Sequence, residues 1–263
     1  MQVTTIGLDI AKNVFQVHGI DAAEKVVVRK QLRRRQVLEF FKALPSCLVG
    51  MEACATAHYW ARELKAMGHE VLLMPPAYTK PYVKRGKNDA VDADAICEAM
   101  SRPGMRFVPI KSAEQQATLM LHKTRELLIK QRTMSVNALR SHLSEFGIVA
   151  AKGIGRVDEL LDLAESDATL PTAARAGVKV LAQALEGLDK AIDDLEDEIT
   201  SADTQNEMVR LLDKVPGIGK LIASVITASV PDPSVFNRGA ISPPGSASRR
   251  GKTRAAASRR LEA

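Results

Sequence analysis

The chain has few aromatic residues, few cysteines and no long apolar run. Aromatic side chains make up 4% of its 263 residues, a content that suits packed helices better than a β-sandwich. No apolar stretch approaches the roughly 20 residues that a transmembrane helix needs. A strand pattern begins directly after the first residue, so we expect neither a signal peptide nor a membrane span.

The three cysteines do not have the spacing of a metal-binding or redox motif. Cys47 begins a predicted strand, Cys54 lies in the loop after it, and Cys97 lies in a predicted helix. An odd number of cysteines argues against a disulfide framework. We therefore expect a protein of the reducing cytoplasm.

Positive charge is in excess overall, but it is concentrated near the C-terminus. The formal net charge is +6, and the segment from Arg238 onward carries seven basic residues and one acid. The preceding chain is neutral, so nucleic-acid contacts there must come from local clusters. One is Arg33–Arg35, which a solvated charged face explains equally well. The other abuts Asp89, as a phosphate backbone beside an acidic site requires, and consists of Lys80, Lys84, Arg85 and Lys87.

The first 110 residues alternate between strand and helix patterns. Three β-branched runs bounded by turn residues predict an antiparallel meander at Val3–Ile10, Val14–Ile20 and Lys25–Leu32. Apolar periodicity then predicts one α/β domain. Its further elements are helices at Gln36–Leu44, Ala57–Met67 and Asp89–Met100 and strands at Cys47–Glu52 and Glu70–Met74.

Four carboxylates of this domain follow the plan of a two-metal nuclease. Asp9 and Glu52 each end a predicted buried strand, and Asp89 and Asp92 share one face at a helix start. Such a set can hold two divalent ions about 4 Å apart. Each acid alone fits a turn or cap, but their order predicts a ribonuclease-H-like domain. Asp94 lies on another helix face and reads as a solvated extra.

Two long helices are predicted beyond residue 110. Ala113–Phe146 contains no proline and no internal glycine, and a polar, glycine-rich stretch follows it. The next helix has an apolar seam with alternating spacings of three and four, typical of a coiled coil. The seam could pack on the preceding helix or pair two subunits. It consists of Val178, Leu181, Leu185, Leu188, Ile192, Leu195 and Ile199.

A glycine-containing turn lies between two apolar helical stretches within Leu211–Val230. The segment Val215–Lys220 matches a helix-hairpin-helix motif, in which backbone N–H groups at a helix start hold a phosphate. Gly217, Gly219 and Lys220 are the candidate nucleic-acid contacts. An ordinary tight turn is the alternative.

These segments together resemble the Asp-Glu-Asp-Asp transposases of bacterial insertion sequences, which have a RuvC-like N-terminal domain and are guided by a bridge RNA. The resemblance rests on Gly7–Lys12, Met51–Cys54, Lys87–Ala93 and Pro216–Gly219 and extends from about Gln2 to Asn237. It implies that Mg²⁺ binds four acids, that DNA and a guide RNA are partners, and that the coiled coil helps to hold a homo-oligomer. The four acids are Asp9, Glu52, Asp89 and Asp92.

The resemblance divides the chain into four parts. We expect a RuvC-like catalytic domain at 1–110, long helices with a coiled coil at 111–205, the helix-hairpin-helix start of a C-terminal transposase domain at 206–237, and a disordered tail at 238–263. The family has a core helix and a serine nucleophile where this chain reads Ala240–Ser248 and an Arg/Ala-rich end. Codons exist that spell both in another frame, so we interpret the tail as an out-of-frame reading.

The sequence therefore predicts a transposase that acts by metal-dependent DNA cleavage and strand transfer, in a copy that is defective in the second step. A RuvC-like structure-specific endonuclease would need only the four acids. A non-catalytic nucleic-acid-binding remnant would need only the basic clusters and the hairpin turn. Metal-dependent nicking separates the last two hypotheses, and strand joining separates the first from both.

Overall fold

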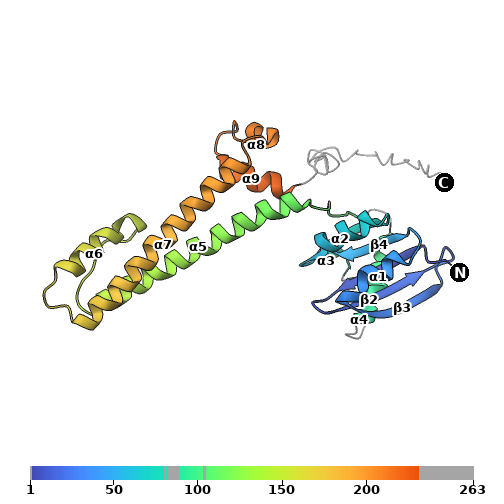
Figure 1. Cartoon of the computed structure of the whole chain (residues 1–263), viewed down its shortest axis with the longest axis horizontal. Helices are drawn as coiled ribbons and strands as arrows, with labels where there is room; N and C mark the ends of the chain where they lie inside the picture. Colours follow the sequence, from blue (N-terminus) through green and yellow to red (C-terminus); the bar gives the residue numbers. More distant parts are fainter. Residues whose placement is uncertain (1, 80, 82–88, 103–104, 231–263) are drawn as a thin grey trace, which may run out of the picture. The chain divides into compact units, whose positions relative to one another are not determined.

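A computed structural model describes residues 2–79, 81, 89–102 and 105–230 (Figure 1). Within those ranges, the side chains of residues 89–91 and 154 are not described. The predicted contacts at Lys84, Arg85 and Lys87, and the predictions about the tail at 238–263, lie outside the described residues.

A five-stranded mixed sheet forms the centre of the N-terminal part (Figure 1). Its order is β3-β2-β1-β4-β5, with β1–β2–β3 antiparallel and β4 and β5 parallel to β1. The predicted meander and both later strands are confirmed, with bounds that differ by at most two residues. This arrangement is compatible with a ribonuclease-H-like domain. The strands are β1 Thr5–Ile10, β2 Val14–Ile20, β3 Val26–Arg33, β4 Leu48–Glu52 and β5 Glu70–Met74.

Two helices, α1 (Val37–Lys42) and α2 (Ala57–Ala66), cover one face of this sheet. A 3-10 turn at Arg34–Gln36 leads into α1. Alternation along β2 points the Phe15 side chain toward these helices. The rings of Phe15 and Trp60 lie 4.9 Å apart, edge to face. Burial of this apolar layer stabilises the domain.

The helix α4 (Asp89–Met100) covers part of the other face, packing on β1 and β2 and more lightly on β4. Gly7 on β1 lets its backbone come close, because an added Cβ would overlap the Ala93 carbonyl oxygen and crowd the Cys97 amide. At Gly50 on β4 the nearest atoms to an added Cβ belong to the flexible side chain of Met100. A four-residue helix, α3 (Pro76–Thr79), was not predicted.

We expect Gly7→Ala to lower the free energy of unfolding by about 3 kcal/mol, because backbone cannot yield as a side chain can. The same change at Gly50 should cost less, about 1 kcal/mol, since the Met100 side chain can rotate away. Urea denaturation of both variants measures the difference. Equal losses of unfolding free energy in the two variants would show that the α4 backbone moves away as easily as the Met100 side chain.

Two long helices, α5 (Ala113–Ser144) and α7 (Thr172–Ala202), pack as an antiparallel hairpin. A capping box at Ser112 and Gln115 starts α5. The seam residues Leu185, Ile192 and Ile199 of α7 are buried. Two ion pairs join the helices, Arg125–Glu196 at 2.5 Å and Arg132–Asp189 at 2.6 Å. The sequence left two possible partners for the seam, the preceding helix and a second subunit. In the structure the seam packs on the preceding helix, α5.

The polar, glycine-rich stretch between these helices is more ordered than its composition predicts. It contains a 3-10 turn at Ile154–Arg156 and the helix α6 (Val157–Ser166). Val157 and Leu160, on the apolar face of α6, pack with residues of α5 and α7, and this burial stabilises the short helix.

Two short helices, α8 (Glu207–Leu212) and α9 (Lys220–Ser229), follow, and α9 packs against α5 and α7. None of the helices in the described ranges combines the length and the apolarity that crossing a bilayer requires.

The cysteines are free thiols. Burial raises the pKa of Cys47 and of Cys97 to about 11, so these two thiols are not nucleophiles at neutral pH.

Candidate functional site

Asp9 and Glu52 lie at matching positions on two neighbouring parallel strands. The register of β1 and β4 pairs Gly7 with Gly50 and Leu8 with Met51, so the next position in each strand carries one of the two acids. Neighbouring strands run about 4.8 Å apart. Both side chains are half-buried and, by alternation, lie on the face that α4 covers. The structure thus brings these two predicted residues together.

The direction of α4 places its N-terminus toward these acids. Ser101 and Arg102, just after its end, lie with Thr4 and Thr5 at the beginning of β1, and its middle contacts Gly7. The helix therefore runs opposite to β1, and its first turn lies toward the strand ends. Asp89 and Asp92 occupy that turn.

The four acids are not all equally placed. The Asp92 side chain is half-buried, whereas the Asp89 side chain lies outside the described residues. Among the side chains that are described, no three from His, Cys, Asp and Glu come together closely enough to hold one metal ion. The donor set itself fits a hard divalent cation, since carboxylate oxygens are the ligands that Mg²⁺ prefers.

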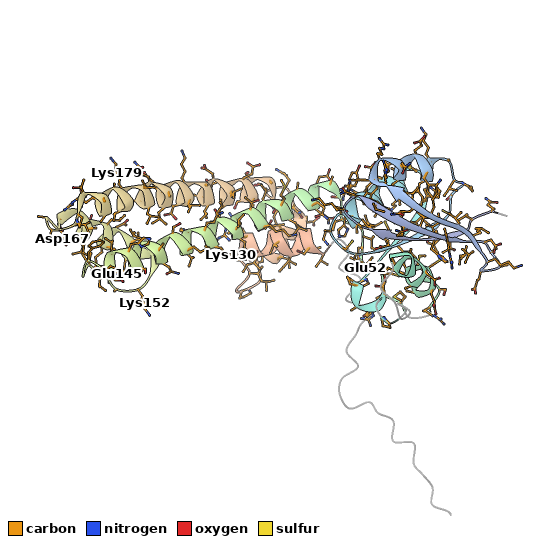
Figure 2. The ribbon with its side chains drawn as sticks, turned by 90° about the horizontal axis from the view of Figure 1, so that it is seen from below. Glu52, Lys130, Glu145, Lys152, Asp167 and Lys179 are labelled. Atoms are coloured by element: carbon orange, nitrogen blue, oxygen red, sulfur yellow. The ribbon has the colours of Figure 1, made fainter. Side chains whose placement is uncertain are left out.

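Two residues, Cys54 and Thr79, interact with the pair formed by Asp9 and Glu52. Burial raises the pKa of the Cys54 thiol, and the charges of Glu52 and then Asp9 raise it further, so both carboxylates act on one point in space. The buried Thr79 hydroxyl donates to Glu52 Oε2 at 3.4 Å. The same hydroxyl lies 3.1 Å from the Pro76 carbonyl oxygen, so its single proton is shared between two acceptors; Glu52 is labelled in Figure 2.

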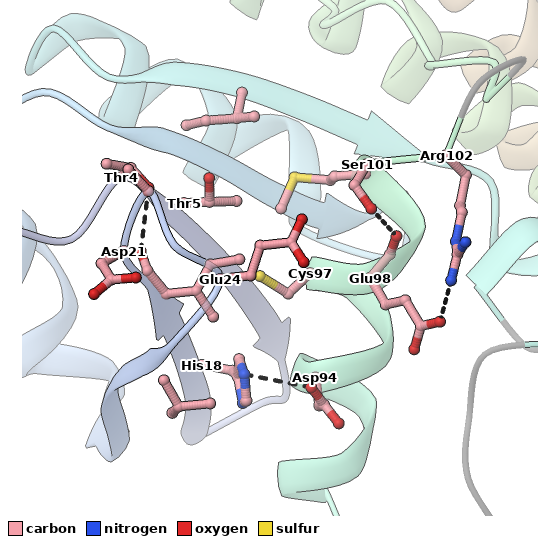
Figure 3. Close-up of a pocket in the computed structure, with 15 residues that line it drawn as sticks. Thr4, Thr5, His18, Asp21, Glu24, Asp94, Cys97, Glu98, Ser101 and Arg102 are labelled. Carbon is pink, nitrogen blue, oxygen red and sulfur yellow. Dashed lines mark hydrogen bonds and ion pairs between the residues drawn. The ribbon is translucent and has the colours of Figure 1, made fainter.

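Asp94 has a structural partner rather than a purely solvated side chain. Its Oδ1 lies 3.3 Å from Nε2 of His18, which is 2% exposed on β2. The pair fastens α4 to the sheet (Figure 3). No local pattern predicts this contact, because the two residues are 76 positions apart and meet only through the tertiary fold.

A hollow of about 550 Å³ lies at the other end of α4, beside the start of β1 (Figure 3). Its lining includes Asp21, Glu24 and Glu98, and Glu98 is bound to Arg102. The described acids of the candidate site, Asp9, Glu52 and Asp92, are not part of this lining. The hollow is therefore separate from the candidate site.

The predicted phosphate-binding turn joins α8 to α9. Gly217 has φ +88°, a left-handed conformation that favours glycine. Gly219 is the N-cap of α9 and supplies no side-chain cap, and Lys220 is exposed. Because Gly219 has no side chain, it does not cap the first-turn N–H groups of α9.

Comparison with known proteins gives consistent matches. A family model described as transposase, of the Asp-Glu-Asp-Asp IS110 type, matches residues 6–148. A protein named as a transposase in Sinorhizobium fredii is 46% identical over 90% of this chain and 62% of its own length. One named as a family 20 transposase in Pseudomonas aeruginosa is 47% identical over 91% and 72%. The transposase for insertion sequence element IS1328 of Yersinia enterocolitica is 36% identical over 88% and 69%. The chain thus spans about three fifths of the length of the first of these relatives.

Proposed function

The chain belongs to the Asp-Glu-Asp-Asp transposases of the IS110 type, and we propose that it acts in transposition of an insertion sequence by cleaving DNA phosphodiester bonds at Asp9, Glu52, Asp89 and Asp92. The observation that carries the proposal is the matched position of Asp9 and Glu52 on β1 and β4, facing the helix that bears the other two acids. We place this action in the cytoplasm, where bacterial DNA lies.

In this proposal Asp9 and Glu52 on the strands, with Asp89 and Asp92 on the helix, would hold a divalent cation. A bound Mg²⁺ would activate water and neutralise charge on the leaving oxygen. The Thr79 hydroxyl contacts the Glu52 carboxylate, and the half-buried setting of Asp9 strengthens its charge interactions relative to bulk water. The contact of Asp94 with His18 keeps the acid-bearing helix on the sheet.

We propose two sets of nucleic-acid contacts. One is the turn at Gly217, Gly219 and Lys220, supported by its open backbone and exposed lysine. The other is the basic cluster of Lys84, Arg85 and Lys87, supported by its place next to Asp89 in the sequence. The family resemblance supports a guide RNA as a second nucleic-acid partner.

We also propose that two copies of the chain associate through the outward face of α5. The seam of α7 is covered by α5, so pairing of copies needs another surface. Met120, Leu127 and Met134 are 64%, 53% and 70% exposed and follow one another at intervals of seven. This spacing places the three apolar side chains on one side of the helix, where a second copy could cover them.

The test of the cleavage proposal is a nicking assay on supercoiled plasmid DNA. We expect open-circular product with the full chain and Mg²⁺ and no product with EDTA, because water activation needs the cation. Ends joined to a second DNA would favour a transposase reaction, and nicking without joining would favour a RuvC-like endonuclease. DNA binding without any Mg²⁺-dependent nicking would contradict both and leave the binding remnant.

A further inference from the structure

The helix α4 covers only part of its face of the sheet, and the edge strand β3 carries polar side chains on the same face. Register pairs Arg29 with His18 and Gln31 with Gln16. His18 contacts α4, so cross-strand alternation puts Arg29, Gln31 and Arg33 on the α4 side. The intervening Lys30 lies over the Phe40 ring on the opposite face.

The polar side chains continue a row that begins at the acids. Cross-strand pairing joins Asp9 to Gln16 and Gln16 to Gln31, with Glu52 on the other side of Asp9. At about 4.8 Å per strand, Gln31 lies roughly 10 Å from Asp9. Arg29 and Arg33 are four residues apart, about 13 Å along the strand, on either side of the row.

We name Gln16, Arg29, Gln31 and Arg33 the β2–β3 strip. Its β3 members are exposed, and Gln16 is half-buried. A hollow of about 190 Å³ lies along it, lined in part by Gln16, Arg29 and Gln31. Neither arginine of the strip forms an ion pair with any side chain in the described part of the chain.

These features suit a ligand with repeated negative charges. A guanidinium group offers a planar fork of donors that matches phosphate oxygens, and glutamine amides also donate to phosphates. Charged residues on an edge strand can serve simply to prevent edge-to-edge association. That role does not require them to share a face and a row with the acids.

We propose that the β2–β3 strip binds the sugar–phosphate backbone of the nucleic acid and leads it to the carboxylates of β1 and β4. The inference rests on the proposed function for what is cleaved, but it is a statement about binding. A backbone crossing the strip would meet Arg29 and Arg33 on either side of the row and then reach Asp9 and Glu52.

The test measures binding of the full chain to a fluorescent DNA duplex by anisotropy, in EDTA so that no cleavage occurs. We expect Arg29→Gln with Arg33→Gln to weaken binding about 10-fold or more. The slope of log affinity against log salt should fall by about 2, since each phosphate contact contributes about 0.9. Gln31→Glu, which keeps both arginines, should also weaken binding through repulsion of phosphate.

The matched control is Lys152→Gln with Lys179→Gln, which removes the same charge from exposed sites near the α5–α7 connection (Figure 2). We expect the control to keep affinity and salt slope close to those of the unaltered chain. The same titrations with RNA of equal sequence identify the polymer, and a loss confined to RNA would assign the strip to an RNA ligand.

Strip variants that bind DNA and RNA as the control does would overturn the inference, as would an unaltered chain that binds neither. A chain that loses affinity on strip substitution but never nicks DNA would sustain the strip and refute the cleavage proposal. A chain that nicks DNA normally with the strip altered would sustain the cleavage proposal and refute the role of the strip.

Discussion

Replacing Glu52 with glutamine is expected to reduce Mg²⁺-dependent nicking roughly 1,000-fold. The substitution keeps the shape of the side chain and its contact with Thr79 but removes the negative charge. A lost ligand charge removes several kcal/mol of transition-state stabilisation, and each 1.4 kcal/mol or so is a factor of ten in rate. Single-turnover nicking of supercoiled plasmid measures the loss.

The same variant should separate a chemical role from a structural one. Mg²⁺ should raise the melting temperature of the unaltered chain, since a ligand that binds only the folded state stabilises it. It should leave Glu52→Gln nearly unchanged. Without the cation the variant should be at least as stable, because one of two neighbouring like charges is gone.

Glu70→Gln is the matched control. Glu70 is exposed at the beginning of β5, the opposite end of the neighbouring strand from Glu52. It should nick DNA and respond to Mg²⁺ like the unaltered chain. If Glu52→Gln cleaved as fast as this control, the site could not lie on β1 and β4.

Replacing Ile192 with aspartate is expected to destabilise the α5–α7 hairpin strongly. Ile192 is 3% exposed in the seam that packs on α5. Loss of its burial costs about 1.5–3 kcal/mol, and an unpaired carboxylate in that place adds to this, for a total of about 4 kcal/mol or more. Such a loss is a large fraction of the roughly 5–15 kcal/mol by which a usual chain is stable. Circular dichroism in a urea titration measures it.

Two further substitutions separate folding of the hairpin from association of two copies. Asp193→Asn, at the exposed neighbour, should change the free energy of unfolding by no more than about 0.5 kcal/mol. Leu127→Lys on the outward face of α5 should be equally mild for folding but should convert a dimer to a monomer in light scattering. An unaltered chain that is strictly monomeric would remove the proposal of association through α5, and full stability of Ile192→Asp would contradict the hairpin packing.

Local signals predicted most elements well. The helix at Asp89–Met100 and the strand at Glu70–Met74 have the predicted bounds, because apolar periodicity and flanking turn residues are properties of neighbouring positions. The helix α6 was missed although Val157, Leu160, Leu161 and Ala164 recur at intervals typical of a helix. The glycine-rich stretch before it obscured that pattern.

The sequence by itself determined the order of the five strands and of most helices, the family motifs and the acidic residue types. Only the tertiary structure decided which residues meet. The pairing of Asp9 with Glu52 depends on the register of two strands separated by more than 30 residues, and the His18–Asp94 contact depends on how α4 crosses the sheet. The partner of the α7 seam was open for the same reason. Periodicity tells which face of an element is apolar, but the element that covers it is set by long-range packing, which no local pattern encodes.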